Sequence, residues 1–210
     1  MKVGEIKAQA IMLMYPSVFV KYDETDDADI ERAIYELKLD PNFEGLINSF
    51  TGSINRALAY IESQGYGERK CVHIKKSECE RTADGLVILK TEKDFYKAES
   101  VLCRQGDKAA ALDFEVISKG VITKDMGTEY TLIYRARMPR LSTISCDSAV
   151  LEVPLGMAEH IPYFLASELL ANENEELSRE YRGYFEREIK HLGELGAECH
   201  SCVMALYSME

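Results

Sequence analysis

The spacing of apolar residues changes twice along the chain. Before about residue 66 they recur at intervals of three and four, from about 67 to 138 they alternate in short runs, and after about 151 the longer interval returns. An interval of three to four residues is typical of one face of a helix, and alternation is typical of a strand. The pattern therefore predicts helices, then strands, then helices.

The first part should contain three helices. Residues 4–14 predict an amphipathic helix, and a short second helix is expected near 30–37. The strongest helix should start at Asp40 as N-cap with Pro41 in its first turn, and "SQGYG" should end it. The three predicted apolar faces consist of Ile6, Ala10, Leu13 and Met14; of Ile30, Ala33, Ile34 and Leu37; and of Leu46, Ile47, Phe50, Ile54, Ala57, Leu58 and Ile61.

The middle part predicts five or six antiparallel strands. Its runs, such as "KCVHIKK", "GLVILKT" and "YTLIYRARMP", are β-branched or aromatic and are separated by turn residues. They follow one another too closely for the helical crossovers that parallel strands need. Tyr130, Leu132 and Tyr134 alternate with Thr131 and Ile133. Since both faces of this strand are partly apolar, we expect it to lie between two layers.

The last part predicts a helical hairpin. Pro162 is tolerated only in a first turn, so the first helix should start near it. Asn172 with Glu175 resembles a capping box for the second helix, and Gly193 and Gly196 should end that helix. Gly183 lies mid-helix, either because a neighbour approaches closely or because the position is exposed. The two stripes are Ile161, Phe164, Leu165 and Leu169, then Leu177, Tyr181, Phe185, Ile189 and Leu192.

These elements predict an α+β fold, in which a bundle of about four helices receives an inserted antiparallel β module. The expected division is 1–66 for the first part of the bundle, 67–150 for the β module, 151–196 for the completing hairpin and 197–210 for a tail. The tail, "AECHSCVMALYSME", is apolar and follows two glycines. We expect it to be buried either on a partner or as a strand of the protein's own sheet.

Composition narrows the classes of function. The chain has 210 residues, is 46% hydrophobic and 29% charged, and has a net charge of -11. It should therefore fold, and it lacks the basic footprint of a duplex-DNA reader. No apolar run approaches a membrane span, and no signal peptide is recognisable, so we expect a cytosolic product with reduced cysteines.

The sequence offers only weak candidates for a chemical site. No phosphate-binding loop, dinucleotide fingerprint, nucleophile elbow or H-E-x-x-H is present, and Glu175 and Glu176 belong to a helix start, so we expect no enzyme. "CHSC" could hold zinc only with a second ligand cluster, and redox use or simple packing are the alternatives. We favour packing and expect no catalytic residue, cofactor or metal. The residues that could supply a zinc site are Cys199, His200 and Cys202 with Cys71, His73 and Cys79.

A set of basic residues flanks the predicted sheet. Tyr130 and Tyr134 are interleaved nearby, so the set could form a nucleic-acid platform. Lysines that protect a sheet edge from pairing are the commoner explanation. The set comprises Arg69, Lys70, Lys75, Lys76, Arg135, Arg137 and Arg140.

Four stretches follow one another in an order that is typical of a known family. They are "KVGEIKAQAIMLM", "FEGLINSFTGSINRALAYIES", the β segment from "DFYKAES" to "YRARMP", and "LEVPLGMAEHIPYFLASELLANENEELSREYRGYFEREIKHL". Their order resembles the head–tail connector, or adaptor, proteins of tailed bacteriophages, and is similar to the tail tubular protein A group. The resemblance implies a virion structural protein, made in the host bacterial cytoplasm, that forms a ring below the portal.

The same resemblance implies the partners, which are the portal protein, tail proteins and further copies of the chain. DNA would pass through the ring without sequence-specific binding, and an acidic lumen would keep phosphates from adhering. We expect no membrane partner. The alternative is a cellular α+β ligand-binding or regulatory module whose β insert holds a small molecule.

Overall fold

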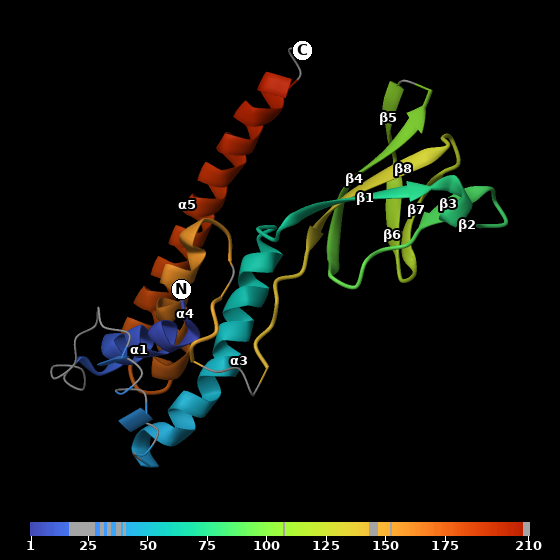
Figure 1. The fold of residues 1–210 in the computed structure, drawn as a ribbon. Coiled ribbons are helices and arrows are strands. Elements are labelled where there is room, and N and C mark those ends of the chain that lie inside the picture. Colours follow the sequence, from blue (N-terminus) through green and yellow to red (C-terminus); the bar gives the residue numbers. More distant parts are fainter. Residues whose placement is uncertain are drawn as a thin grey trace. The chain divides into compact units, whose positions relative to one another are not determined.

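Figure 1 shows the elements of the fold in a computed structural model of the chain. The structure describes residues 1–16, 28, 29, 32, 35, 36, 39, 41–106, 108–142, 147–151 and 153–207, with side chains except at 42–44, 154, 155 and 195–207. Of the helix expected near 30–37, Arg32, Tyr35 and Glu36 are described and are helical. Its predicted apolar face (Ile30, Ala33, Ile34 and Leu37), the Asp40 cap and most of the acidic run at 22–31 lie outside the described residues.

The fold is α+β and divides into two compact units. The helical unit comprises Met1–Tyr66 and Pro139–Glu210, and the β unit comprises Gly67–Met138. Among the described residues, four α-helices and two antiparallel sheets of four strands each are present. The β unit is thus one continuous segment inserted between two helical segments.

The helical unit is built from α1 (Val3–Met14), α3 (Pro41–Ser63), α4 (Ile161–Leu170) and α5 (Glu175–Tyr207), with the 3-10 helix η3 (Pro154–His160) before α4. Helix α4 packs against α1, α3 and α5. The predicted stripe of α3 is buried, with Phe50, Ile54 and Leu58 fully enclosed. Neither helical segment could bury its stripe alone, so the two segments stabilise each other.

Aromatic rings join α5 to the other helices of this unit. The Phe185 ring centroid lies 5.0 Å from that of Phe164 on α4 and 5.4 Å from that of Tyr60 on α3. Tyr181 instead contacts Tyr163 on α4, and its hydroxyl donates a hydrogen bond to the Leu13 carbonyl of α1 at 3.1 Å. The two helical segments therefore meet mainly through α4, which packs against α1 and α3, and Phe185 and Tyr181 of α5 add contacts to α3 and α1.

The segment after Met138 belongs to the helical unit, which corrects the expected boundary at residue 150. It returns along the start of the chain, where the Val3 amide donates to the Ala149 carbonyl and the Leu151 amide to the Met1 carbonyl. The ammonium group of Lys7, a residue only 5% exposed, lies 2.6 Å from the Asp147 carboxylate. These contacts hold the returning chain on α1.

Helix α5 differs from expectation at both ends. Its N-terminal cap is Asn174, whose side-chain oxygen accepts from the Leu177 amide at 3.1 Å, so Asn172 is not the cap. The helix also does not stop at Gly193. A β-carbon there would overlap the Tyr66 ring, so this glycine allows close packing inside a continuing helix. Gly183, in contrast, has no neighbour within 4 Å of a built β-carbon and is exposed.

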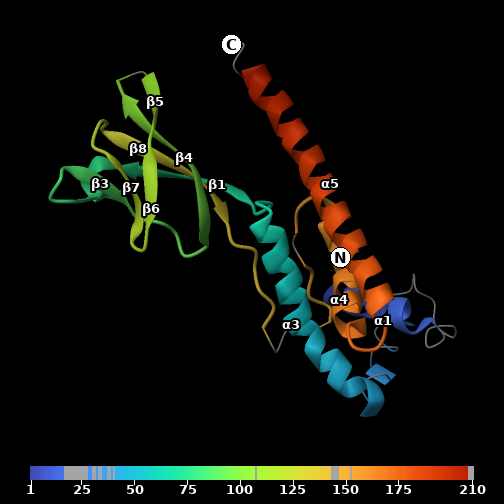
Figure 2. The ribbon, with the colours of Figure 1, turned by 180° about the vertical axis from the view of Figure 1, so that it is seen from behind.

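The tail is therefore helical as far as Tyr207, and the expectation that it adds a strand to the sheet is wrong. Its backbone extends beyond the other helices of the helical unit in both ribbon views (Figures 1 and 2). Despite this length, no described helix is apolar enough to cross a membrane.

The β unit contains more strands than the sequence predicts. One sheet has the order β1-β8-β4-β5 and the other β2-β3-β7-β6, and all pairs are antiparallel. A short 3-10 helix, η2 (Lys76–Glu78), follows the first strand. The strands are β1 (Arg69–Lys75), β2 (Glu80–Arg81), β3 (Leu86–Leu89), β4 (Phe95–Gln105), β5 (Lys108–Leu112), β6 (Phe114–Ile117), β7 (Gly120–Lys124) and β8 (Glu129–Ala136).

Both sheets contribute side chains to one packed core. Strand β8 buries Tyr130, Leu132 and Tyr134 on one face, while Thr131 and Ile133 on the other stay half-buried. It therefore lies centrally in its sheet but covers the core with one face only. The core residues are Ile74, Val87, Leu89, Ala98, Val101, Cys103, Val121, Tyr130, Leu132, Tyr134 and Ala136.

Candidate interaction surfaces

Charge is divided unevenly between the two units. Of the chain's lysines and arginines, 14 lie between Gly67 and Met138 with 12 aspartates and glutamates, while the rest of the chain has 11 against 24. The β unit thus carries +2 and the helical unit -13, which together give the net charge of -11. A phosphate backbone would be repelled mainly by the helical unit.

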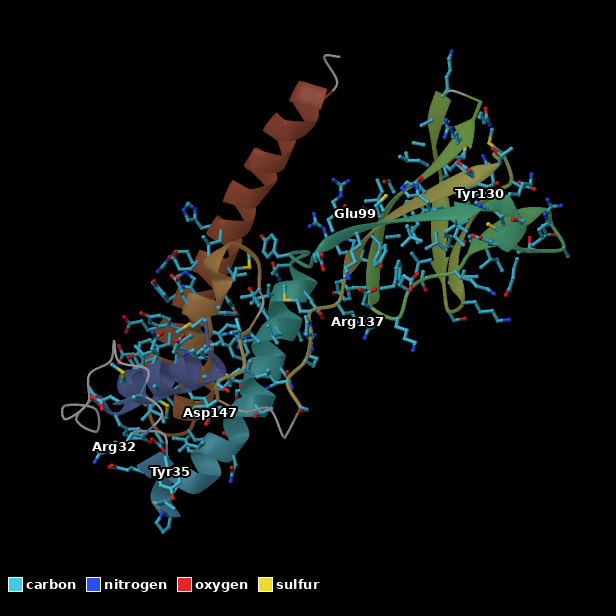
Figure 3. The ribbon with its side chains drawn as sticks, in the orientation of Figure 1. Arg32, Tyr35, Glu99, Tyr130, Arg137 and Asp147 are labelled. Carbon is cyan, nitrogen blue, oxygen red and sulfur yellow. The ribbon has the colours of Figure 1, made fainter. Side chains whose placement is uncertain are left out.

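Most of the basic residues that flank the sheet are engaged by acids. Lys70 lies 2.6 Å from Asp94, and Lys76 lies 2.7 Å from Asp125. Glu99, which is labelled in Figure 3, forms ion pairs with both Arg69 and Arg135. Arg140 belongs to the helical unit and pairs there with Glu62, while Arg137 donates to the Phe95 carbonyl. A platform for nucleic acid needs free cations, so these pairs count against that interpretation.

Protection of the sheet edge from pairing explains the same basic residues better, because β1 is an edge strand. It carries Arg69, Lys70 and Lys75, and charged side chains hinder the addition of another strand. The opposite edge of this sheet is β5, which has the sequence "KAAAL" and four exposed residues. The two edges of one sheet therefore differ, one charged and one built from alanine.

Two buried tyrosines on β8 are fixed by two aspartates, one directly after β7 of the other sheet and one directly before β4. The Tyr130 hydroxyl donates to Asp125 at 2.9 Å, and the Tyr134 hydroxyl donates to Asp94 at 3.0 Å. Burial and the bond to Asp94 raise the pKa of Tyr134 to about 12. The hydrogen bond from Lys70 lowers the pKa of Asp94. These networks satisfy the polar tips of core residues, so they stabilise the β unit.

A group of half-buried rings covers one side of the α4–α5 pair; it comprises His160, Tyr163, Tyr181 and Tyr184 and is called the aromatic face below. The Tyr163 ring centroid lies 4.3 Å from that of Tyr184 and 5.8 Å from that of Tyr181. The His160 ring lies 5.8 Å from that of Tyr184, and its buried Nδ1 has no hydrogen-bond partner among the described residues. Burial raises the pKa values of Tyr181 and Tyr184.

The cysteine and histidine candidates are only partly described. Cys71 is exposed and Cys79 half-buried, and both are free thiols. The His73 ring contacts the Thr131 hydroxyl at 3.0 Å. Among the described residues, no group of three or more His, Cys, Asp and Glu side chains could hold a metal ion. The side chains of Cys199, His200 and Cys202 lie outside the description, so their role stays a prediction.

The aromatic face was not singled out from the sequence as a site. Tyr181 was assigned to the buried stripe, and Tyr163 and Tyr184 were not assigned to any face. The signal that could have found them is their position around the hairpin turn. Tyr163 lies before the turn and Tyr181 and Tyr184 lie after it, and antiparallel helices bring such positions together. Glu175 and Glu176 lie in the first turn of α5, where the helix dipole favours acids.

Comparison with known proteins gives no relative from which a role could be transferred. No protein-family model matches the chain, and no curated protein matches it.

Proposed function

We propose that this chain is a structural protein of a tailed-phage virion, a head–tail connector that joins the portal to the tail. Copies of the chain would form a ring around the DNA channel, with the helical unit next to the portal. The observation that carries the proposal is the unequal charge of the two units, -13 against +2. An acidic channel wall repels phosphates, so DNA would pass through without adhering.

The arrangement of elements supports the same proposal. The stretches that resemble connector proteins fall on α1, on α3, on β4 to β8 and on the segment from η3 through α4 into α5. In such proteins a helical bundle interrupted by a β module is the ring subunit. The long α5, which extends past its own bundle, would then reach the portal or a neighbouring subunit.

The alternative of a ligand-binding module would require room inside the β unit. The space between its two sheets is instead filled by apolar and aromatic side chains, including the fully buried Val101, Tyr130 and Leu132. The hydroxyls of the buried Tyr130 and Tyr134 donate to Asp125 and Asp94, which leaves the interior apolar. This packing favours the structural role over the binding of a small molecule.

The decisive experiment mixes the purified protein with the portal protein encoded in the same genome. We expect the chain alone to be a monomer or weak oligomer, and the mixture to contain a ring complex. Light scattering on both samples measures the masses, and electron microscopy shows the ring. Failure to associate with that portal, or the absence of portal and terminase genes nearby, would remove the proposal.

A further inference from the structure

The two edges of the sheet β1-β8-β4-β5 are protected unequally. Strand β1 carries Arg69, Lys70 and Lys75, whereas β5 has Lys108 at its hairpin end and then three exposed alanines. Charged side chains, proline and bulges are the usual features that keep an edge strand from pairing with another chain. Apart from Lys108, β5 has no charge and no proline, and its register with β4 is regular. It is therefore the open edge of this sheet.

The backbone groups that face the open side belong to Ala109 and Ala111. The Arg104 carbonyl accepts from the Thr128 amide beside β8, so the backbone groups of Arg104 face β8 and not β5. Arg104 lies opposite Ala109, and direction alternates along a strand, so Ala109 and Ala111 point N–H and C=O away from β4. Among the described residues, neither alanine makes a hydrogen bond outside its pairing with β4.

A second copy of β5 fits this edge in an antiparallel, two-fold register. When Ala109 of one copy lies opposite Ala111 of the other, each of the two pairs exchanges two N–H···O bonds. This register sets Lys108 opposite Leu112, so no like charges face each other. The alanines present only a methyl group on either face of the strand, so no long side chain blocks the approach.

The distribution of charge also favours contact through the β units. The helical unit carries -13 and the β unit +2, so two copies repel each other least where their β units meet. Two strands of five residues offer less surface than the roughly 1,200 Å² that a stable interface buries. The contact should therefore be weak and should depend on protein concentration.

We propose that β5 pairs with β5 of a second copy and joins the two sheets across a two-fold axis, as a weak dimer. The four outward N–H and C=O pairs of Ala109 and Ala111, two from each copy, make the contact. A two-fold contact closes on itself, so it differs from the head-to-tail contacts that build a ring. The inference does not depend on the connector proposal.

The first test measures association of the full chain. Sedimentation equilibrium from about 10 μM to about 1 mM should show a dimer that forms toward the upper end of the range. Added salt should not weaken this dimer, because backbone hydrogen bonds hold it and salt screens the repulsion between two acidic chains.

Hydrogen exchange followed by nuclear magnetic resonance locates the contact. The amides of Ala109 and Ala111 should exchange more slowly as the concentration rises. The control is the Cys71 amide on the opposite edge. The Lys76 amide donates to the Thr128 carbonyl, so by the same alternation the Cys71 amide faces outward on β1, and its exchange should not depend on concentration.

Substitutions on β5 separate pairing from folding. Ala111→Pro removes an outward N–H, and proline is tolerated on an edge strand, so the dimer should weaken about tenfold or more while the melting temperature changes little. Ala111→Thr keeps the N–H and should keep the dimer. Ala109→Lys adds to β5 the kind of charge that protects β1, and it should also weaken the dimer.

Several results would overturn the inference. These are a chain that stays monomeric at about 1 mM, a dimer that survives both Ala111→Pro and Ala109→Lys, or exchange at Ala109 and Ala111 that does not depend on concentration. Open-ended polymers in place of a dimer would exclude the two-fold contact. Association with the portal is measured separately, so the two proposals fail separately.

Discussion

The two units reach stability in different ways. The β unit is one continuous segment whose sheets enclose a core of their own, and its charges nearly balance. The helical unit combines segments that lie on either side of that insertion, and it carries almost all of the net charge. When a unit is assembled from distant segments, bringing them together lowers the entropy of the chain before any contact forms between them. The comparison therefore predicts that the units respond separately to mutation.

Phe185→Ala should have the largest effect on the helical unit. Its ring is fully buried and joins α5 to both Phe164 and Tyr60, so truncation should cost about 3–5 kcal/mol. Hydrogen exchange followed by mass spectrometry should show faster exchange in α1, α3, α4 and α5 and unchanged exchange in β4 and β8. The control is Leu132→Ala in the β core, which should reverse the pattern. One joint transition in both variants would show that the units are a single folding unit.

Tyr134→Phe should have the largest pH-dependent effect on the β unit. Near neutral pH it removes a hydrogen bond to a charged group, at a cost of about 1.5–3 kcal/mol. The folded pKa of about 12 lies above the unfolded value of about 10, so this contribution is full below pH 10 and is lost as the pH rises toward 12. The free energy of unfolding, measured with urea across this pH range, should fall in the parent protein and stay nearly constant in the variant.

The contribution of Asp94 to the free energy of unfolding depends on pH in the opposite direction. The pKa of Asp94 is lowered by Lys70, so its contribution is present above the unfolded value of about 3.9 and is lost as the pH falls further. Asp94→Asn should remove this acid dependence. Tyr181→Phe in the helical unit serves as control and should leave the alkaline profile of the β unit unchanged. An identical profile in all three variants would contradict the assigned network.

The elements predicted best from the sequence are those in which the spacing of apolar residues alone decides which face is buried. The apolar stripe of α3 from Ile47 to Ile61 is buried as expected, and so are Phe185 and Ile189 on α5. A helix with one apolar face must bury that face. Strand β5 was missed because alanine has a low β propensity, and its pairing with β4 decides its conformation. The cap of α5 was misplaced by two residues, since "NEN" offers two asparagines.

The surfaces were harder to predict because they depend on contacts between distant residues. The basic set could be read from the sequence, but its neutralisation by Asp94, Glu99 and Asp125 could not. A glycine in a helical stretch has two meanings, a stop or a close contact, and only the position of Tyr66 decides between them for Gly193. The aromatic face likewise requires the hairpin geometry.

Gly193→Ala should have a smaller effect, confined to the helical unit. Helix propensity alone would predict a gain of up to about 1 kcal/mol, but the new methyl group would overlap the Tyr66 ring. We expect a net loss of about 1–3 kcal/mol, as for other overpacked sites. Thermal unfolding measures it, and Tyr66→Leu in the same chain should restore part of the loss. A stabilised Gly193→Ala variant would show that the ring moves aside freely.

The smallest effect on stability is expected from deleting residues 197–210. In both ribbon views the backbone of α5 continues past the other helices of the helical unit, and residues 197–207 form its outer end. We expect the melting temperature to stay within the range of a surface change, about 0.5 kcal/mol. An apolar helical arm that the bundle does not need is available to a partner, and in the proposed ring that partner is the portal or a neighbouring subunit. The truncated protein should therefore fold normally and lose association with the portal. A loss of several kcal/mol, or aggregation of the truncated chain, would instead assign the arm to the core of its own subunit.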